Sequence, residues 1–320
     1  MEAIQLGNTV EEQLRHKIKR LSTGPWSEQF TSGDLLSKWL SNFDNDEYVP
    51  MLYLLSNFMY FDNSCIRELL HRAYEDLYRR PLIFSIRRSH NNITDMGIIN
   101  KEFKQILKNT RFIGIGNPSE SSSHLLYYYR QENNLDTKLF IDAHEIYSHS
   151  IDSNNKINTS IVLKDVKRIV FIEDFCGSGT QAEEYYHKFV EIIKSQLPDS
   201  VIELHILFAT DHGYERISKL GYDDVKVIYT LNSSYKCFHE NSRFFPSLYK
   251  DEDGVDIIDK ETCLNICNEY GLQLTPDNPF GYNDGQLLIS FHHNTPNNTL
   301  PIFWCSKNWN PIFKRYTKNY

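Results

Sequence analysis

The feature that most constrains the fold is an alternation, after about residue 100, between short apolar runs and segments with helical spacing. The runs end in small or polar residues and read RFIGIG, RIVFIEDF, VIELHILFAT and VKVIYTL. Strands that are buried on both faces have continuous apolar sequences, and their alternation with helices implies right-handed βαβ units. Residues 100–320 are therefore predicted to form an α/β domain with a parallel sheet and a C-terminal extension.

The region before residue 85 has a different pattern. From about residue 10 to 80 the apolar positions recur with helical spacing, as in the stripe that contains Leu36, Trp39 and Phe43. Pro81 predicts the end of the last of these helices, because its ring cannot continue one. Residues 1–85 are therefore predicted to form a helical N-terminal module.

Composition excludes several classes of protein. The net charge of -8 argues against a protein that coats nucleic acid by itself. Arg79, Arg80, Arg87 and Arg88 are interpreted as a solvated basic face. The N-terminus has no apolar core of signal-peptide type, and no apolar run is long enough to span a bilayer, so we expect a cytoplasmic protein without a membrane partner. The six cysteines form no C-x-x-C pair, which favours reduced thiols.

Parallel sheets bind ligands at the carboxyl ends of their strands. Three such ends are expected, at Asn117, Glu173 and Thr210. The second is the most informative, because Glu173 and Asp174 close the strand of VFIEDFCGSGTQ and the residues Gly177, Ser178, Gly179 and Thr180 open a helix. Glycine permits close backbone approach, so several amide groups converge on one anion at the positive end of the helix. The carboxylates suit hydroxyl groups or a Mg²⁺ ion.

This segment resembles the phosphoribosyl-diphosphate (PRPP) loop of type I phosphoribosyltransferases. Glu173 and Asp174 match the two acids of that motif, Ser178 and Gly179 match its Thr-Gly, and Gln181 stands where its final Thr is expected. The resemblance implies that residues 177 to 181 anchor a 5′-phosphate. It also implies that the two acids are catalytic, holding the ribose hydroxyls or Mg²⁺ and offsetting positive charge at C1′.

Two other interpretations remain open. The segment EDFCGSGT also resembles the DPFCGSGT segment of amino-methyltransferases, whose glycines approach S-adenosylmethionine; here Asp174 replaces the proline. The methyltransferases need a second motif with two prolines, which GNPSES and DNPFGY lack. The third interpretation is a non-catalytic module that senses a nucleotide in the same cleft and assembles with partners.

Two further segments resemble parts of the phosphoribosyltransferases. ILFATDHGYERISKLGY is similar to the unit that follows the PRPP loop, and Thr210, His212 and Gly213 carry the likeness. FIGIGNPSESSSHLL occupies the place of the pyrophosphate loop, which makes Asn117 and Ser121 cleft candidates. The charge of Glu120 in that loop would repel pyrophosphate.

The C-terminal segment PFGYNDGQLLISFHHNTPNNTLPIFW, residues 279 to 304, resembles the terminal signature of phosphoribosyltransferase-like proteins of bacterial conflict systems, including retron operons. That resemblance implies an antiphage effector restrained by partners, such as a reverse transcriptase with its RNA or DNA, or a DNA-binding protein. A homo-oligomer is also compatible with that resemblance. Within the segment, a strand leads into a polar loop with the cleft candidates His292, His293, Asn294 and Asn297. His212, His292 and His293 are candidate proton carriers because histidine titrates near neutral pH.

Overall fold

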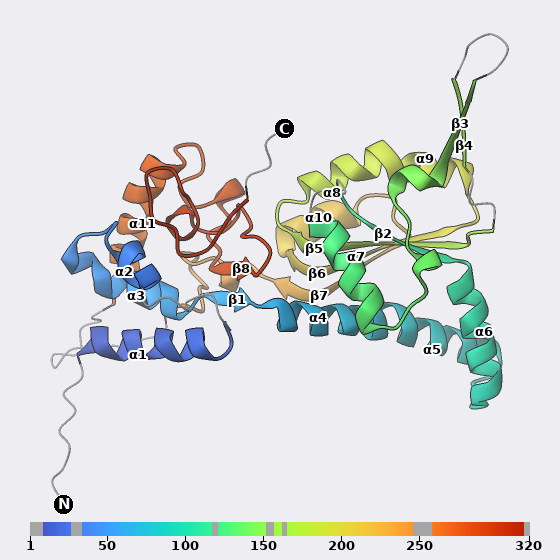
Figure 1. The fold of residues 1–320 in the computed structure, drawn as a ribbon, viewed down its shortest axis with the longest axis horizontal. Coiled ribbons are helices and arrows are strands. Elements are labelled where there is room, and N and C mark those ends of the chain that lie inside the picture. Colours follow the sequence, from blue (N-terminus) through green and yellow to red (C-terminus); the bar gives the residue numbers. More distant parts are fainter. Residues whose placement is uncertain are drawn as a thin grey trace, which may run out of the picture. The chain divides into compact units, whose positions relative to one another are not determined.

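The computed structural model describes residues 9–26, 34–116, 121–151, 157–161, 165–245 and 258–316 (Figure 1). Contacts divide the chain into two compact units. Unit 1 combines Met1–Ile66 with Asn232–Tyr320, and unit 2 is Arg67–Leu231. Among the described residues, no helix has the length and apolar character needed to cross a membrane.

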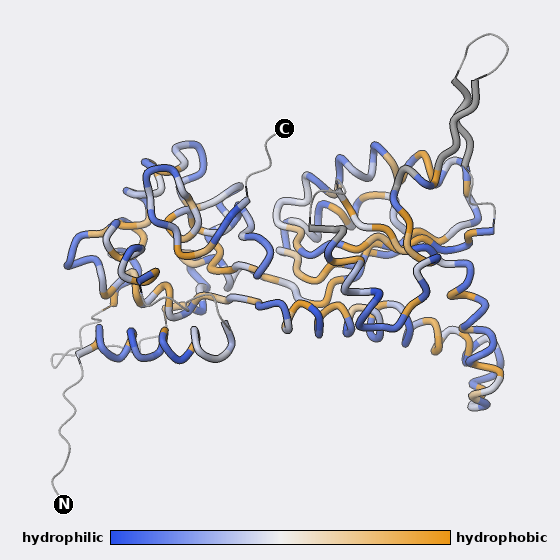
Figure 2. Tube along the Cα trace, in the orientation of Figure 1, coloured by the Kyte–Doolittle hydropathy of each residue, from blue (hydrophilic) through white to orange (hydrophobic). Residues whose placement is uncertain are grey.

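Unit 2 is built on a four-stranded parallel sheet with the order β2-β5-β6-β7. The strands are β2 (Thr110–Gly114), β5 (Arg168–Cys176), β6 (Val201–Thr210) and β7 (Asp224–Leu231). The two central strands are almost entirely buried, as their continuous apolar sequences require. Figure 2 shows these strands as mainly hydrophobic segments, with more hydrophilic segments among the helices around them. The predicted α/β fold with a parallel sheet is confirmed.

Helices pack on both faces of this sheet. On one face, Ile169 and Phe171 of β5 share a core with the consecutive helices α8 (Thr180–Tyr185), η5 (Tyr186–Val190) and α9 (Glu191–Gln196), and with α10 (Asp211–Ser218). On the other face, the ring of Phe112 contacts Tyr78 and Tyr129, with centroid distances of 5.2 and 5.3 Å. Tyr78 belongs to the π-helix η2 (Ala73–Arg79), and Tyr129 belongs to α7 (Ser121–Glu132). The carboxyl ends of β5 and β6 therefore lead directly into α8 and α10.

The helix before the sheet continues through Pro81, so the predicted helix end at this residue is wrong. Helix α4 (Asn63–Arg72), η2 and α5 (Arg80–Ser89) follow one another without a break. Proline has no N–H to donate to the carbonyl four residues earlier, which is that of Leu77. This carbonyl instead accepts a hydrogen bond from the Lys226 ammonium at 2.9 Å. The helix ends at Ser89, and α6 (Met96–Lys108) then begins with Asp95 as its N-cap.

The remaining elements of unit 2 are short. The segments η3 (Thr137–Leu139) and η4 (Ala143–Ile146) connect α7 to the antiparallel strands β3 (Tyr147–Ile151) and β4 (Ile157–Ile161).

Unit 1 joins the two ends of the chain. Its first part contains α1 (Val10–Thr23), α2 (Asp34–Leu40), η1 (Asn45–Glu47), α3 (Tyr48–Ser56) and β1 (Met59–Phe61). Its second part contains η6 (Ser233–Tyr235), α11 (Lys260–Leu274), η7 (Tyr282–Asp284), β8 (Ile289–Phe291) and η8 (Pro301–Phe303). Strands β1 and β8 pair in parallel.

This grouping differs from the predicted boundaries of 1–85 and 100–320. The Trp39 ring of α2 stacks on Phe303 at a centroid distance of 5.4 Å, and its indole N–H donates to the Ile302 carbonyl at 2.9 Å. Phe43 contacts Trp309 in the same core. The apolar stripe of the first helices is thus buried by the C-terminal extension. The two segments form one core rather than a separate module and an appendage of the sheet.

Candidate functional site

Glu173 and Asp174 lie near the carboxyl end of β5, where the sequence places the acid pair. Both are buried, with exposed fractions of 8% and 7%. Asp174 Oδ1 accepts the backbone N–H of Phe175 at 2.8 Å. Successive side chains of a strand point to opposite faces, so the two carboxylates leave β5 in different directions. The two carboxylates therefore lie on opposite faces of the sheet.

The surroundings of Glu173 include two side chains whose pKa it affects. Burial and then the Glu173 charge raise the pKa of Cys176 to about 12. Burial, the neighbouring tyrosines and Glu173 also raise the pKa of Tyr222. Cys176 and Tyr222 belong to the core under α8. Since a thiol with such a pKa stays protonated near neutral pH, Cys176 is not suited to act as a nucleophile.

The loop between β5 and α8 has the backbone geometry that its glycines predict. Gly179 is the N-cap residue of α8 and has a φ of 77°, in the left-handed region that disfavours other residues. The hydroxyl oxygens of Ser178 and Thr180 lie 3.1 Å apart, and the Thr180 N–H points to Ser178 Oγ at 3.4 Å. Two hydroxyls are therefore held together at the start of a helix, a few residues after the buried acids in the chain.

The end of β6 braces this loop. The Thr210 hydroxyl donates to the Gly177 carbonyl at 2.6 Å and accepts the Gly213 N–H at 3.0 Å, which also caps α10. A Cβ atom on Gly213 would lie only 2.4 Å from the Gly177 carbonyl oxygen. The ATDHG segment thus holds the loop through a hydroxyl and a close backbone contact. Both bonds engage the Thr210 hydroxyl, so this residue positions the loop.

Arg216 also contacts the loop, and the sequence did not single it out. Its guanidinium donates to Thr180 Oγ1 at 2.9 Å, approaches the Ser178 carbonyl at 3.5 Å and pairs with Glu183. Arg216 stands four residues after His212 on α10, so helical spacing offered a signal that the two share a side of the helix. Both line a groove of about 520 Å³, with Glu183, Glu215, Lys219 and Leu220. The positively charged Arg216 side chain therefore lies beside the Thr180 hydroxyl of the loop.

Comparison with known proteins identifies the family. The model of the PRTase-CE family matches residues 36–315, most of both units. The chain belongs to the PRTase-CE family. The predicted likeness to phosphoribosyltransferases is thereby confirmed at the level of the family, whereas the predicted defence context stays a prediction.

Solved structures similar to this PRTase-CE protein include phosphoribosyltransferases. The xanthine-guanine-hypoxanthine phosphoribosyltransferase of Helicobacter pylori is 13% identical, with 50% of this chain and 90% of that chain covered and a TM-score of 0.23. The hypoxanthine phosphoribosyltransferase of Trypanosoma cruzi is 11% identical, with 53% and 81% covered and a TM-score of 0.27. The search of curated proteins found no match.

Asn117, Ser121 and His212 are the remaining predicted site residues from this part of the chain. Asn117 lies outside the described residues, and Ser121 is the first residue of α7. His212 is exposed on α10. The structure therefore brings residues 173 to 181 together with Thr210, Gly213 and Arg216 within unit 2.

The candidates from the C-terminal segment belong to unit 1. Asn294 Oδ1 accepts the backbone N–H groups of Thr295 and Tyr316, both at 3.0 Å, so its side chain fixes a turn. The Asn297 carbonyl accepts the N–H of Tyr282 at 2.7 Å. The His293 ring stacks on Phe291 with a centroid distance of 5.6 Å and contacts the His292 ring. These bonds account for the predicted polar loop as a hydrogen-bonded turn beside β8.

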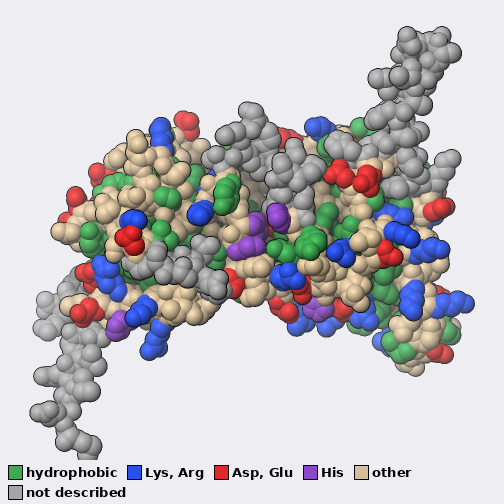
Figure 3. Space-filling view, viewed as in Figure 1, with side chains coloured by type: hydrophobic (Ala, Val, Ile, Leu, Met, Phe, Trp, Pro, Cys, Tyr) green, Lys and Arg blue, Asp and Glu red, His purple; other side chains and the backbone are tan. Residues whose placement is uncertain are grey.

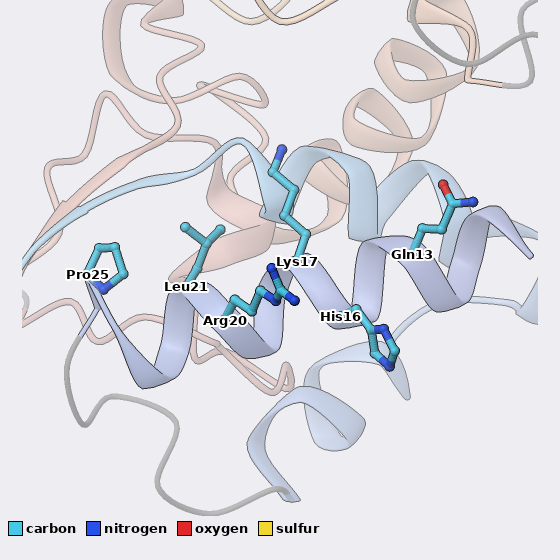
Figure 4. A pocket seen from close by; sticks show the side chains of 6 residues that line it. All are labelled: Gln13, His16, Lys17, Arg20, Leu21 and Pro25. Atoms are coloured by element: carbon cyan, nitrogen blue, oxygen red, sulfur yellow. The ribbon is translucent and has the colours of Figure 1, made fainter. Parts of the chain in front are cut away.

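A second hollow lies along α1 in unit 1. It measures about 550 Å³ and is lined by Gln13, His16, Lys17, Arg20, Leu21 and Pro25. Figure 4 shows the Lys17 side chain directed toward α3, away from His16. Its ammonium donates to Ser56 Oγ at 3.3 Å and Asn57 Oδ1 at 3.2 Å, and burial lowers its pKa. Lys17 therefore ties α1 to α3, and the described residues that line the hollow include no carboxylate.

Proposed function

We propose that this PRTase-CE protein binds PRPP or another nucleotide with a ribose 5-phosphate at residues 177 to 181, and acts at the C1′ atom of the ribose. The observation that carries the proposal is the braced loop between β5 and α8. Its glycine backbone, its paired hydroxyls and its place at the carboxyl end of a central parallel strand together suit a phosphate.

The 5′-phosphate is bound by the first amide groups of α8 and by the hydroxyls of Ser178 and Thr180. Amide groups at a helix N-terminus point toward the anion, and the helix dipole favours negative charge there. Arg216 adds a positive charge beside Thr180. Because Arg216 also pairs with Glu183, part of its charge is balanced before a ligand arrives.

The acids act on the ribose. Cleavage at C1′ develops positive charge on the sugar, and carboxylates placed nearby stabilise that charge. Because the two side chains leave β5 in different directions, we assign the ribose hydroxyls to Asp174 and a longer-range electrostatic contribution to Glu173.

Mg²⁺ suits the oxygen donors of this site. Among the described residues, no group of three or more His, Cys, Asp and Glu side chains is arranged to hold a metal ion. Asp174, together with hydroxyl or phosphate oxygens of the ligand, would hold the ion, in keeping with the preference of Mg²⁺ for a few carboxylates and phosphates. When bound, Mg²⁺ neutralises negative charge on the leaving group.

Ligand-dependent thermal stability of the purified chain tests the binding step. We expect PRPP with Mg²⁺, or a nucleoside 5′-phosphate, to raise the Tm of the wild-type protein because a ligand that binds only the folded state stabilises it. Ser178→Ala is expected to reduce this shift, while Ser195→Ala, an exposed serine on α9, serves as the matched control. Stabilisation by S-adenosylmethionine alone would instead favour the methyltransferase interpretation.

A measurement of turnover distinguishes an enzyme from a non-catalytic module that only binds the nucleotide. Incubation with PRPP or nucleotides, followed by chromatography of the products, is expected to reveal loss of the bond at C1′ in the wild type but not in Asp174→Asn. Asp174→Asn must retain the wild-type far-UV spectrum for this comparison. Binding without any product, in both proteins, would favour the non-catalytic module.

The biological setting is proposed from the resemblance of residues 279 to 304. We assign the protein to a bacterial antiphage system, as an effector controlled by partner proteins or nucleic acid encoded beside it. Phage plating on cells that carry the operon tests the assignment. Protection by the wild type and none by Asp174→Asn is expected, and equal protection by both would contradict a role for the site.

A further inference from the structure

One helix of unit 2 presents an uncompensated row of positive charge. Lys101, Lys104 and Lys108 are exposed on α6 with the spacing i, i+3 and i+7, which places them along one side of the helix. The buried residues Ile99 and Phe103 lie on the other side. Arg111 of β2 extends the row, since its guanidinium donates to the Lys108 carbonyl at 3.0 Å. We call these four residues the α6 basic face.

The charge of this region contrasts with the rest of the chain. Residues 79–111 contain eight Lys and Arg, of which Arg79 and Arg80 pair with Glu75 and Asp76, but only two Asp and Glu, whereas the whole chain has 34 and 42. Both acids are already engaged, because Asp95 caps α6 and Glu102 pairs with His90. Figure 3 shows Lys and Arg side chains gathered over the part of unit 2 that carries α6. The α6 basic face is therefore a local positive region on an acidic protein.

Several surface cations on other helices pair with acids one turn earlier. Examples are Arg72 with Glu68, Arg80 with Asp76 and Lys219 with Glu215. On α6, the positions four residues before Lys101, Lys104 and Lys108 are Gly97, Asn100 and Lys104. Among the described residues, no carboxylate lies within ion-pair distance of the α6 basic face. Such pairing accounts for these three cations, but not for those of the α6 basic face.

The arrangement also costs helix stability. Lys104 and Lys108 form a like-charge i, i+4 pair, which repels. Lys108 in the last turn is favoured by the helix dipole, but Lys101 and Lys104 stand too early in α6 to gain from it. Three lysines on one exposed side are therefore not explained by the folding of α6.

We infer that the α6 basic face contacts the phosphate backbone of a nucleic-acid double helix. By the rise of a helix, the lysines are spaced by about 4.5 and 6 Å along its axis, and a duplex offers about one charge every 1.7 Å. Three of the four side chains are lysines, and the face contains no aromatic ring for base stacking, which suits phosphates rather than unpaired bases. The contact is independent of the ligand in the loop between β5 and α8.

Binding of labelled duplexes at several salt concentrations tests the inference. Full-length protein is titrated into fluorescent DNA and RNA duplexes, and the anisotropy is followed. We expect binding at low salt that weakens as salt rises. The triple variant Lys101→Gln, Lys104→Gln and Lys108→Gln is expected to flatten the slope of log affinity against log salt by roughly 2 to 3, because each phosphate contact contributes about 0.9. The DNA and RNA arms distinguish the two kinds of duplex.

A matched control has the same change in net charge elsewhere. Lys138, Lys188 and Lys307 are exposed outside the α6 basic face, and their triple replacement by Gln is expected to leave the slope unchanged. The α6 variant is expected to keep or raise the Tm, since the Lys104–Lys108 repulsion is removed. Absence of duplex binding at low salt, or an equal loss in both variants, would overturn the inference.

Discussion

The hydroxyl of Thr210 joins two segments that lie 33 residues apart, because it bonds to the Gly177 carbonyl and caps α10. We expect Thr210→Val, which keeps the shape but loses the hydroxyl, to lower the free energy of unfolding by about 1 to 2 kcal/mol. Thr210→Ser keeps the oxygen and is expected to remain close to the wild type. Urea unfolding followed by far-UV circular dichroism measures both. A loss in Thr210→Ser with none in Thr210→Val would mean that the methyl group, not the hydroxyl, carries the effect.

Single residues of the loop could be predicted where local chemistry determines them. The left-handed Gly179 and the paired hydroxyls of Ser178 and Thr180 follow from the Gly-Ser-Gly-Thr sequence itself. Arg216 could not be predicted as a loop contact, because its bond to Thr180 joins residues 36 apart and depends on how α10 packs beside α8. Thr210 was correctly placed at a strand end, but its use as a brace becomes visible only with the Gly177 carbonyl opposite it.

At the scale of elements, Lys226 links strand β7 to the helix that contains Pro81. Its ammonium bonds to the Leu77 carbonyl and to Glu203, at 2.9 and 3.0 Å. We expect Lys226→Met to lower the free energy of unfolding by about 2 to 3 kcal/mol, because it leaves a carbonyl without its donor and weakens a buried ion pair. Lys219→Met, which alters an exposed pair, is expected to change stability by less than about 0.5 kcal/mol. Thermal and urea unfolding measure both, and equal effects would contradict the bridging role.

The order of strands and helices in unit 2 follows the apolar runs of the sequence, since each buried strand needs a continuous run of its own. The continuation of the helix through Pro81 could not be read from the sequence. Proline normally ends a helix unless the carbonyl four residues earlier finds another donor, and here that donor comes from a strand 149 residues away. The rule is local, and a long-range contact overrides it here.

For the whole molecule, the parallel sheet was predictable but the grouping of the termini was not. The stripe containing Trp39 and Phe43 predicted a buried helix face, without indicating what buries it. Its partners Phe303 and Trp309 lie more than 260 residues later. Sequence periodicity reports that a face is apolar, whereas the identity of the covering segment is a tertiary property.

The two units are expected to respond differently to acid, because unit 2 contains a buried ionic cluster. Glu203 lies between Arg168 and Lys226, with Glu203–cation distances of 2.7 and 3.0 Å, and His205 lies 3.3 Å from it. Burial opposes ionisation of Glu203, but the nearby His205 ring and the charges of Arg168 and Lys226 lower its pKa to about 2. Burial also lowers the pKa of His205.

Both shifts have the same consequence for stability. A carboxyl with a depressed pKa stabilises the fold above its unfolded value of 4.5, and this contribution is lost as the pH falls toward 2. A histidine with a depressed pKa favours the fold above its unfolded value of 6.5, and this contribution is lost as protonation begins below that pH. Unit 2 should therefore lose stability progressively below pH 6.5, and the Glu203 shift alone accounts for on the order of 2 kcal/mol at pH 3.

Fluorescence separates the units, because the four tryptophans, Trp26, Trp39, Trp304 and Trp309, all belong to unit 1. Unfolding in urea at pH 7, 5 and 3 is followed by tryptophan emission and by far-UV circular dichroism, which reports both units. We expect the circular dichroism transition to move to lower urea with falling pH and to separate from the fluorescence transition, since compact units with their own cores unfold separately when one is destabilised. Coincident transitions at every pH would show that both units unfold as one cooperative structure, in which acid titration of the Glu203 cluster is transmitted to the core around Trp39.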